Sequence, residues 1–367
     1  MSLRVGRCAV TVLIMHAWAA PDRGATAEEV FQNISRALIT SDDDEETTRV
    51  IENAQPSERI DADAVRVLKE QWAGPRTMRA LENLQARSAN LPAPADAVVT
   101  TAGGADEARQ KAILAKITEY ASHYVSALPN MSCTESTRFT SSGHESGLRG
   151  TRKPSAKLTD GWRLEDTVVE DLDYYQGTET YHTRSLNGAP EARPMGQIRL
   201  SYSRGELGSV LADTFDPASE TQFVWDHWEN LQGRRVAVFR FAIDRDHTHY
   251  WVCCVSTGSM TVNGIVRRRY KKWMSAYRGF VYADPDTGSI LRFVFRNIEI
   301  PAEYNLQDAR NLIEYSTVTL SGRTFLVPVR GVHFSRTQKG QVRDEIEFTN
   351  YRVFGADSSI SFPKDEK

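Results

Sequence analysis

The chain has 367 residues, and its 45 Lys and Arg against 48 Asp and Glu give a formal charge of −3. That length allows one large domain and a small one, with a sizeable buried core. Apolar residues make up 40% and charged residues 25%, which is ordinary globular usage and excludes a largely disordered chain. The near-neutral charge argues against a general nucleic-acid binder, whose affinity depends on many cationic contacts with phosphates.

The first nineteen residues have the pattern of a secretory signal peptide. Arg4 and Arg7 form a short positive region, an apolar stretch runs from Cys8 to Met15, and Ala17-Trp18-Ala19 is an A-x-A cleavage site. A buried N-terminal helix or strand is the alternative. Residues 1–19 therefore predict a periplasmic or secreted protein. No later apolar run is long enough to span a membrane as a helix.

The cysteines matter because export would place them in an oxidising compartment. Cys133, Cys253 and Cys254 remain after removal of the signal, and the last two lie in a run that has the pattern of a strand. Neighbours on a strand point to opposite faces, so at most one of the two easily meets Cys133. A disulfide from Cys133 to Cys253 or Cys254 is one interpretation, and three buried free thiols are the other. The spacing does not indicate a zinc site.

Residues 25–90 predict a small helical module. Thr26 followed by Glu29 is a capping box at the start of its first helix, and residues 60–88 have the apolar spacing of a helical hairpin. The acidic run from Asp42 to Glu46 is interpreted as a solvated loop. We expect the module to be a packing cap on the rest of the protein. The alternative is a module that binds an envelope protein.

Residues 91–105, rich in Pro, Ala and Gly, predict a linker to a large domain over 106–367. This domain begins with an amphipathic helix over 106–128, and a short helix is predicted at 205–213. The remainder predicts strands at 132–140, 165–175, 178–186, 220–230, 234–243, 248–256, 260–272, 276–283, 289–299, 313–320, 323–334 and 343–354. Without alternation of strands and helices, the fold class is α+β: a large curved antiparallel sheet, or open half-barrel, with the long helix on its concave face.

One face of the predicted sheet is strongly aromatic, and the other carries charged residues such as Arg292. A concave aromatic face forms an apolar groove wherever no helix covers it. The residues predicted to line this groove are Trp225, Phe239, Phe241, Phe293 and Phe295. A completely filled core without a cavity is the alternative.

The motifs of several catalytic classes are absent, including the G-x-S-x-G nucleophile elbow, the P-loop and the H-E-x-x-H helix. His247 and His249 are the nearest approach to a pair of metal ligands, because on a strand both would point the same way. The neighbouring Asp246 and Thr248 indicate a turn between strands instead. We therefore expect no catalytic residue, no metal and no cofactor, and a protein that is not an enzyme.

The most cationic segment runs from Arg267 to Lys272. A functional interpretation is contact with anionic lipid headgroups or with an acidic partner. A solvated strand end whose cations pair with some of the many carboxylates is the preferred interpretation.

Several segments resemble the periplasmic lipoprotein-carrier (LolA/LolB-like) superfamily: the helix over 106–128, the turn from Tyr282 to Gly288 with the strand from Ile290 to Phe295, and the closing strand from Glu347 to Arg352. The segments LPNMSCTESTRF, GELGSVLADTFD and FTNYRVF look more closely like uncharacterised secreted bacterial proteins, of the kind found in soil acidobacteria. The resemblance implies an unclosed β-barrel whose concave face, lidded by helices, binds lipid acyl chains.

The function expected from these observations is non-enzymatic binding of a lipid or lipoprotein acyl chain in an apolar groove, by a periplasmic or secreted protein. The alternative is a cell-envelope scaffold or sensor that acts through protein contacts and has no ligand cavity. Nucleic acid is not an expected partner.

Overall fold

The computed structural model describes residues 24–41, 43–101, 106–143, 156–157, 161–199, 202, 204–262, 265–302, 304 and 306–354, with only the backbone described for 156–157 and 251–272. The predicted signal peptide, residues 1–19, lies outside these ranges. None of the described helices is both long and apolar enough to cross a membrane.

The chain begins with four short helices, α1 (Ala27–Thr40), α2 (Asp44–Asn53), α3 (Ala62–Glu70) and α4 (Pro75–Ser88). The predicted capping box is confirmed, because Thr26 accepts a hydrogen bond from the Glu29 backbone and the Glu29 side chain accepts one from the Thr26 backbone. The prediction of a loop over the acidic run is wrong for residues 44–46, which are helical, and Asp42 lies outside the described residues. Asp43 caps α2, and the carboxylates that follow occupy its first turn, where the helix dipole favours negative charge.

Thirteen strands form one antiparallel sheet in the order β1-β7-β8-β11-β12-β13-β14-β15-β2-β4-β5-β6, with β3 beside β4. Their bounds are β1 Val99–Thr100, β2 Met131–Gly143, β3 Ala156–Lys157, β4 Arg163–Tyr175, β5 Thr178–Leu186, β6 Ala189–Pro190, β7 Gln222–Leu231, β8 Arg234–Ile243, β11 Ala276–Ala283, β12 Ile290–Ile298, β13 Asp308–Leu320, β14 Arg323–Thr337 and β15 Gly340–Val353. Strands β9 (Trp251–Val262) and β10 (Ile265–Met274) form a separate two-stranded sheet. The predicted α+β fold with an open antiparallel sheet is confirmed.

The segment predicted to be a linker, residues 91–105, is not irregular throughout. Val98 and Val99 are buried in the same apolar cluster as the N-terminal helices, and β1 pairs with β7 at the edge of the large sheet. The pairing joins the end of the helical module to the sheet through backbone hydrogen bonds. The proposed division of the chain into domains stays a prediction.

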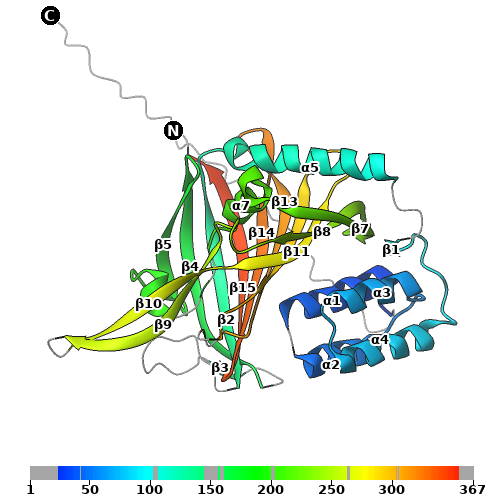
Figure 1. Ribbon diagram of the computed structural model, residues 1–367, viewed down its shortest axis with the longest axis horizontal. Coiled ribbons are helices and arrows are strands. Elements are labelled where there is room, and N and C mark those ends of the chain that lie inside the picture. Colours follow the sequence, from blue (N-terminus) through cyan, green and yellow to red (C-terminus); the bar gives the residue numbers. More distant parts are fainter. Residues whose placement is uncertain are drawn as a thin grey trace, which may run out of the picture.

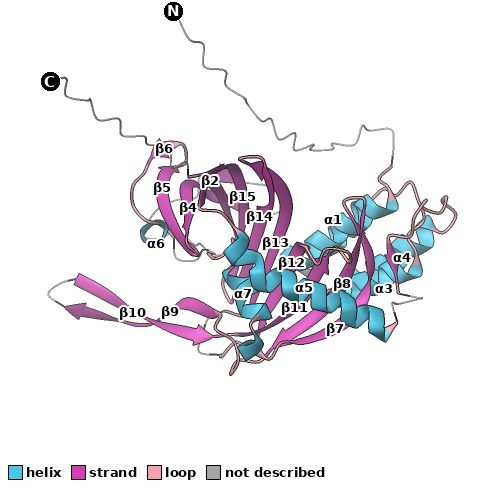
Figure 2. Ribbon diagram, turned by 90° about the horizontal axis from the view of Figure 1, so that it is seen from above, coloured by secondary structure: helices cyan, strands magenta, loops and turns pink. Residues whose placement is uncertain are grey.

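The remaining helices are α5 (Glu107–Ala127), α6 (Met195–Ile198), α7 (Ser209–Phe215) and the 3₁₀ turn η1 (Pro217–Ser219). Helices α5 and α7 lie on the concave face of the curved sheet (Figure 2). Ile113, Ile117 and Tyr124 of α5 are buried against that face, as the amphipathic period predicted. Its outer face is polar and exposed, so α5 is a cover with one apolar side.

Helix α1 covers the convex face of the sheet, on the side opposite α5 (Figure 1). Ile39 packs in one cluster with Val236, Val238 and Tyr282, whose side chains alternate with the aromatic residues of the concave face. The charged convex face predicted from the sequence is therefore partly buried. Arg292, predicted to lie on that face, is only 3% exposed beneath α1.

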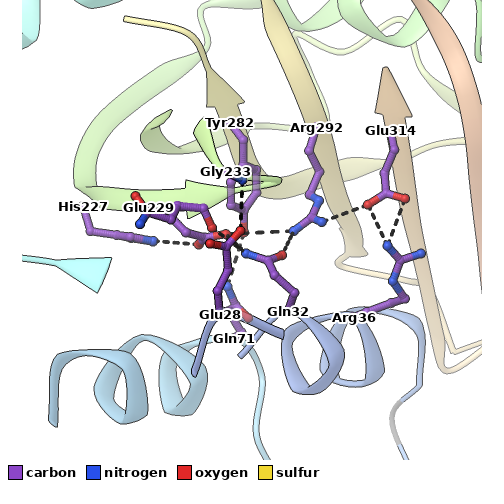
Figure 3. A network of polar contacts seen from close by, with 11 residues as sticks. Glu28, Gln32, Arg36, Gln71, His227, Glu229, Gly233, Tyr282, Arg292 and Glu314 are labelled. Atoms are coloured by element: carbon purple, nitrogen blue, oxygen red, sulfur yellow. Dashed lines mark hydrogen bonds and ion pairs between the residues drawn. The ribbon is translucent and has the colours of Figure 1, made fainter. Parts of the chain in front are cut away.

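The polar groups of this interface form one network (Figure 3). The guanidinium of Arg292 donates to Gln32 at 2.8 Å and to Glu314 at 2.8 Å, and Arg36 of α1 donates to the same Glu314 carboxylate at 2.9 Å. The Gln32 amide donates in turn to Glu229 at 2.9 Å. Burial would raise the pKa of Glu314, but the two guanidiniums outweigh it and hold that pKa below its usual value.

Two further contacts connect the module to the sheet. Arg310 of β13 donates to the backbone oxygens of Leu38 and Ser41 at the C-terminus of α1, at 2.6 and 2.7 Å. Gln71 donates to the hydroxyl of Tyr282 at 3.3 Å. A helix end and a strand thus satisfy each other's buried polar groups. The helices pack on the sheet, as the favoured interpretation expected, and binding of an envelope partner by residues 25–90 stays a prediction.

Replacing Arg292 with Met should destabilise the fold by about 3–5 kcal/mol, because Glu314 and Glu229 would keep their buried charge and lose a partner. The matched control is Arg138→Met, which breaks an exposed strand-to-strand pair with Glu345 and should cost no more than about 1 kcal/mol. Urea unfolding measures both variants. Equal urea midpoints for the two variants would show that the Arg292 network does not stabilise the fold.

His227 gives the interface a pH dependence. Burial would lower its pKa, but hydrogen bonds to Asp226 and Glu229 outweigh burial and raise the pKa to about 9. The stability that protonated His227 supplies is complete below the unfolded-state pKa of about 6.5 and is lost as the pH rises through 9, which amounts to about 3 kcal/mol. The unfolding free energies of the wild type and His227→Gln should therefore converge between pH 6.5 and 9.5. A constant difference would show that His227 is neutral in the folded protein.

Candidate functional site

The five residues predicted to line an apolar groove lie together on the concave face. Phe239 and Phe241 are on β8, Phe293 and Phe295 on β12, and Trp225 on β7. Phe241 stacks on Phe293 with ring centroids 5.0 Å apart, and Trp225 meets Phe239 edge-on at 5.2 Å. The period-two pattern of the sequence thus identified a real aromatic wall.

This wall is covered. The four phenylalanines are at most 3% exposed, because α5, α7 and neighbouring aromatic rings pack over them. A gap next to Phe295, Tyr250 and Val210 holds about 10 Å³, which is roughly the space of one water molecule. The wall is part of a filled core in this conformation. Ligand binding by these five residues stays a prediction.

An open groove lies farther along the same core, between α5 and the strands β12 to β14. Its volume is about 730 Å³, which lies in the range of small-molecule sites. The apolar lining comes from Tyr120, Tyr124, Ala127, Leu128, Leu291, Phe325 and Leu326. Charged residues of both signs stand at its rim, among them Lys116, Glu119, Arg234 and Asp284. We call this space the α5 groove.

The turn after β11 sets the distance between α5 and the sheet. Gly288 has a φ of +75° and lies so close to α5 that a Cβ would stand 2.3 Å from the backbone oxygen of Lys116. Only glycine fits there without strain or a shift of the helix. The Asp284 carboxylate fixes the turn by accepting from the backbone amides of Asp286 and Thr287, both at 2.9 Å. The D-P-D-T-G sequence is thus a spacer that supports one end of the groove.

The other half of the concave face carries buried charges that the sequence analysis did not single out. Glu135 of β2 and Glu170 of β4 are directly opposite in register, and both contact the guanidinium of Arg204. Arg204 also stacks on Tyr181 at 3.7 Å. Burial raises the pKa of Glu135 to about 8, although Arg204 lowers it. Glu135 shares its strand face with Cys133 and other buried residues, and that alternation was the available signal.

A second buried group on this face is Asp344 of β15. Neither of its carboxylate oxygens has a hydrogen-bond partner in the described part of the chain, and burial raises its pKa to about 8. The nearby Arg199 is fully buried and pairs instead with Glu165 at 2.9 Å and Asp166 at 3.4 Å. Asp344 is therefore a protonated, neutral carboxyl at neutral pH.

Cys133 is buried on the concave side of β2, and burial raises the pKa of its thiol to about 12. A thiol held neutral in this way is a packing residue and a weak nucleophile. The side chains of Cys253 and Cys254 lie outside the described residues, so the disulfide stays a prediction.

The two histidines considered as metal ligands have separate partners. His249 contacts Asp213 at 3.1 Å, whereas His247 contacts Glu220 at 3.5 Å. Asp213 also accepts hydrogen bonds from Tyr277 and Thr248, so it connects α7 to the turn after β8. Within the described ranges, no three His, Cys, Asp or Glu side chains are placed to hold a metal ion.

Comparison with solved structures finds likenesses at low identity. A DUF1329 family protein from Desulfovibrio piger has 11% identity and a TM-score of 0.30, with 70% of this chain and 94% of that one covered. A LolA superfamily protein from Nitrosomonas europaea has 8% identity and a TM-score of 0.26, with 68% of this chain and 97% of that one covered. A putative outer membrane lipoprotein-sorting protein domain from Vibrio parahaemolyticus has 9% identity and a TM-score of 0.28, with 68% of this chain and 94% of that one covered.

No protein-family model matches the chain, and no curated protein matches it. Membership of a family is therefore not assigned. The closer resemblance to secreted acidobacterial proteins stays a prediction.

Asp344 offers a test of the buried carboxyls. Because its pKa is raised from 3.8 to about 8, folding is penalised increasingly as the pH rises from 4 to 8, at a rate of up to about 1.4 kcal/mol per pH unit. Asp344→Asn keeps the shape and removes the penalty. Its unfolding free energy should exceed that of the wild type by an amount that grows between pH 5 and pH 8. A pH-independent difference would show that Asp344 is ionised or paired in the folded state.

Proposed function

We propose that the protein is a non-enzymatic, exported binding protein that holds the acyl chain of a lipid or lipoprotein in the α5 groove. The observation that carries this proposal is an open space of about 730 Å³ with aromatic and aliphatic walls on the concave side of the sheet. Apolar side chains left accessible at a groove favour an apolar ligand, because each one gains free energy when it is covered.

The groove is continuous with the apolar core. Tyr124 and Leu128 belong to the same buried cluster as the aromatic wall, and Phe325 and Leu326 are half-buried at its margin. An acyl chain in the groove would therefore extend the core outward and lie between α5 and β14. The charged rim stays in water and is suited to a polar headgroup at the mouth.

Tyr120 supplies one of the polar groups of the groove. Burial raises the pKa of Tyr120 to about 12, against a hydrogen bond to Ser289 that lowers it. The hydroxyl of Tyr120 is then a neutral hydrogen-bond donor at physiological pH, and it orients a ligand without taking up a proton.

Phe325→Gln should weaken the binding of a fluorescent long-chain fatty acid by about tenfold or more, because a half-buried aromatic wall of the groove is replaced by an amide. Val224→Gln is the control, since Val224 is an apolar strand residue that is 58% exposed and outside the groove. Fluorescence titration measures both variants, and thermal unfolding confirms that each is folded.

Native mass spectrometry of the wild type purified from a periplasmic extract should show a co-purified lipid. A bare protein mass, together with no uptake of the fatty acid, would overturn the proposal and leave a scaffold as the function. Uptake that Phe325→Gln and Val224→Gln reduce equally would place the ligand elsewhere.

A further inference from the structure

The connection between β8 and β11 is much longer than the fold requires. These two strands are antiparallel neighbours, with Ile243 of β8 opposite Tyr277 of β11, so a short turn would join them. Instead the chain leaves the sheet and forms β9 and β10, which pair only with each other among the described strands. In both views this ribbon extends away from the body of the protein (Figures 1 and 2). We call β9 and β10 the basic hairpin.

The charge of the basic hairpin is entirely positive. Strand β10 contains five cationic residues among its ten, and β9 contains no charged residue. The rest of the chain has 40 Lys and Arg against 48 Asp and Glu. A cationic ribbon thus projects from an anionic body. Such a ribbon attracts a negatively charged surface at a distance from the body, where the repulsion between that surface and the body is weakest.

The base of the hairpin is fixed to the folded body. Tyr250 packs against Phe295 of the aromatic wall with ring centroids 5.4 Å apart, and its backbone oxygen accepts from the Ser275 amide at 3.1 Å. Trp273, which is 7% exposed, contacts Tyr304 with the two rings tilted and their centroids 5.7 Å apart. An isolated two-stranded hairpin is marginally stable in water. The contacts at its base therefore attach the basic hairpin to the body of the protein.

We propose that the basic hairpin binds the surface of a membrane that contains anionic phospholipids, and this proposal rests on the proposed function of lipid binding. The uncharged strand β9 contains apolar residues and Trp251, which is opposite Met274 in the backbone register. Cations combined with Trp and Tyr are typical of polypeptide at a lipid–water interface. Nucleic acid is the other polyanion that a cationic ribbon attracts, and the test below includes it as an outcome.

The hairpin and the α5 groove lie at opposite ends of β11. The hairpin enters the sheet at Ala276, and the turn that contacts α5 follows Ala283. Membrane binding by the hairpin and ligand uptake by the groove can therefore be measured separately.

The experiment is co-sedimentation of the mature protein with vesicles of phosphatidylcholine, either pure or with about 30% phosphatidylglycerol. We expect binding to the anionic vesicles only, with loss of binding between about 0.05 and 0.5 M NaCl as the charges are screened. The hairpin variant replaces all five cations by Gln, at Arg267, Arg268, Arg269, Lys271 and Lys272. The hairpin variant should bind the anionic vesicles at least tenfold more weakly.

A control variant removes the same amount of charge elsewhere. It replaces five exposed cations by Gln, at Arg66, Arg76, Arg79, Lys111 and Lys339. The control should retain at least half of the wild-type binding. A milder variant, Lys271→Gln with Lys272→Gln, should have an intermediate affinity and keeps the test valid if the full replacement perturbs folding.

Three results would overturn the proposal: no binding of the wild type to anionic vesicles, equal loss in the hairpin and control variants, or tighter binding to a double-stranded DNA fragment than to the vesicles. Uptake of the fluorescent fatty acid without vesicles is measured on the same proteins. Normal uptake by the hairpin variant is expected. Absence of uptake by the wild type would overturn the proposed function while vesicle binding still reports on the hairpin.

Discussion

An open antiparallel sheet has two faces, and in this protein apolar residues occupy both of them. Both faces must be covered, because an aromatic or aliphatic side chain stabilises the folded state only when its surface is removed from water. Helices α5 and α7 cover the concave side, and α1 covers the convex side. Every other feature follows from how these covers fit: the filled aromatic wall, the buried ion pairs beneath α1, and the groove that α5 leaves open at its margin.

The two covers use different chemistry. The concave cover is mostly apolar at the end occupied by Phe241 and Phe293, where the contacts have no strict direction. The convex cover depends on directed pairs such as Arg36 with Glu314. Buried ion pairs of this kind favour a single placement of the helix on the sheet, because a displaced partner leaves a buried charge without compensation. The position of α1 on the sheet is therefore specified by directed contacts, whereas that of α5 is specified mainly by apolar packing and by the close approach of Gly288.

The sequence predicted the periodic features and missed those that depend on contacts between distant segments. Alternation identified the faces of Phe239 and Phe293, and the 3.6-residue period identified α5, because both signals are local. Alternation also placed Arg292 on a charged face, but only the tertiary fold shows that α1 covers that face. Glu135 and Asp344 were missed because a carboxylate is ordinarily assigned to solvent. Whether the aromatic wall is open or filled depends on the distance between α5 and the sheet, which Gly288 sets across a gap of more than a hundred residues.

The positions of the groove and the basic hairpin bear on how a lipid could be transferred. The strand β11 separates the two, with the hairpin at its start and the turn beneath α5 at its end. A protein that rests on a membrane through the hairpin would keep the mouth of the α5 groove at a distance from the bilayer. The hairpin would then act as a tether, and an acyl chain would enter or leave through water or through a second protein at the groove. Exposure of an acyl chain to water costs about 0.8 kcal/mol for each methylene, so release into water is the less favourable of these two routes.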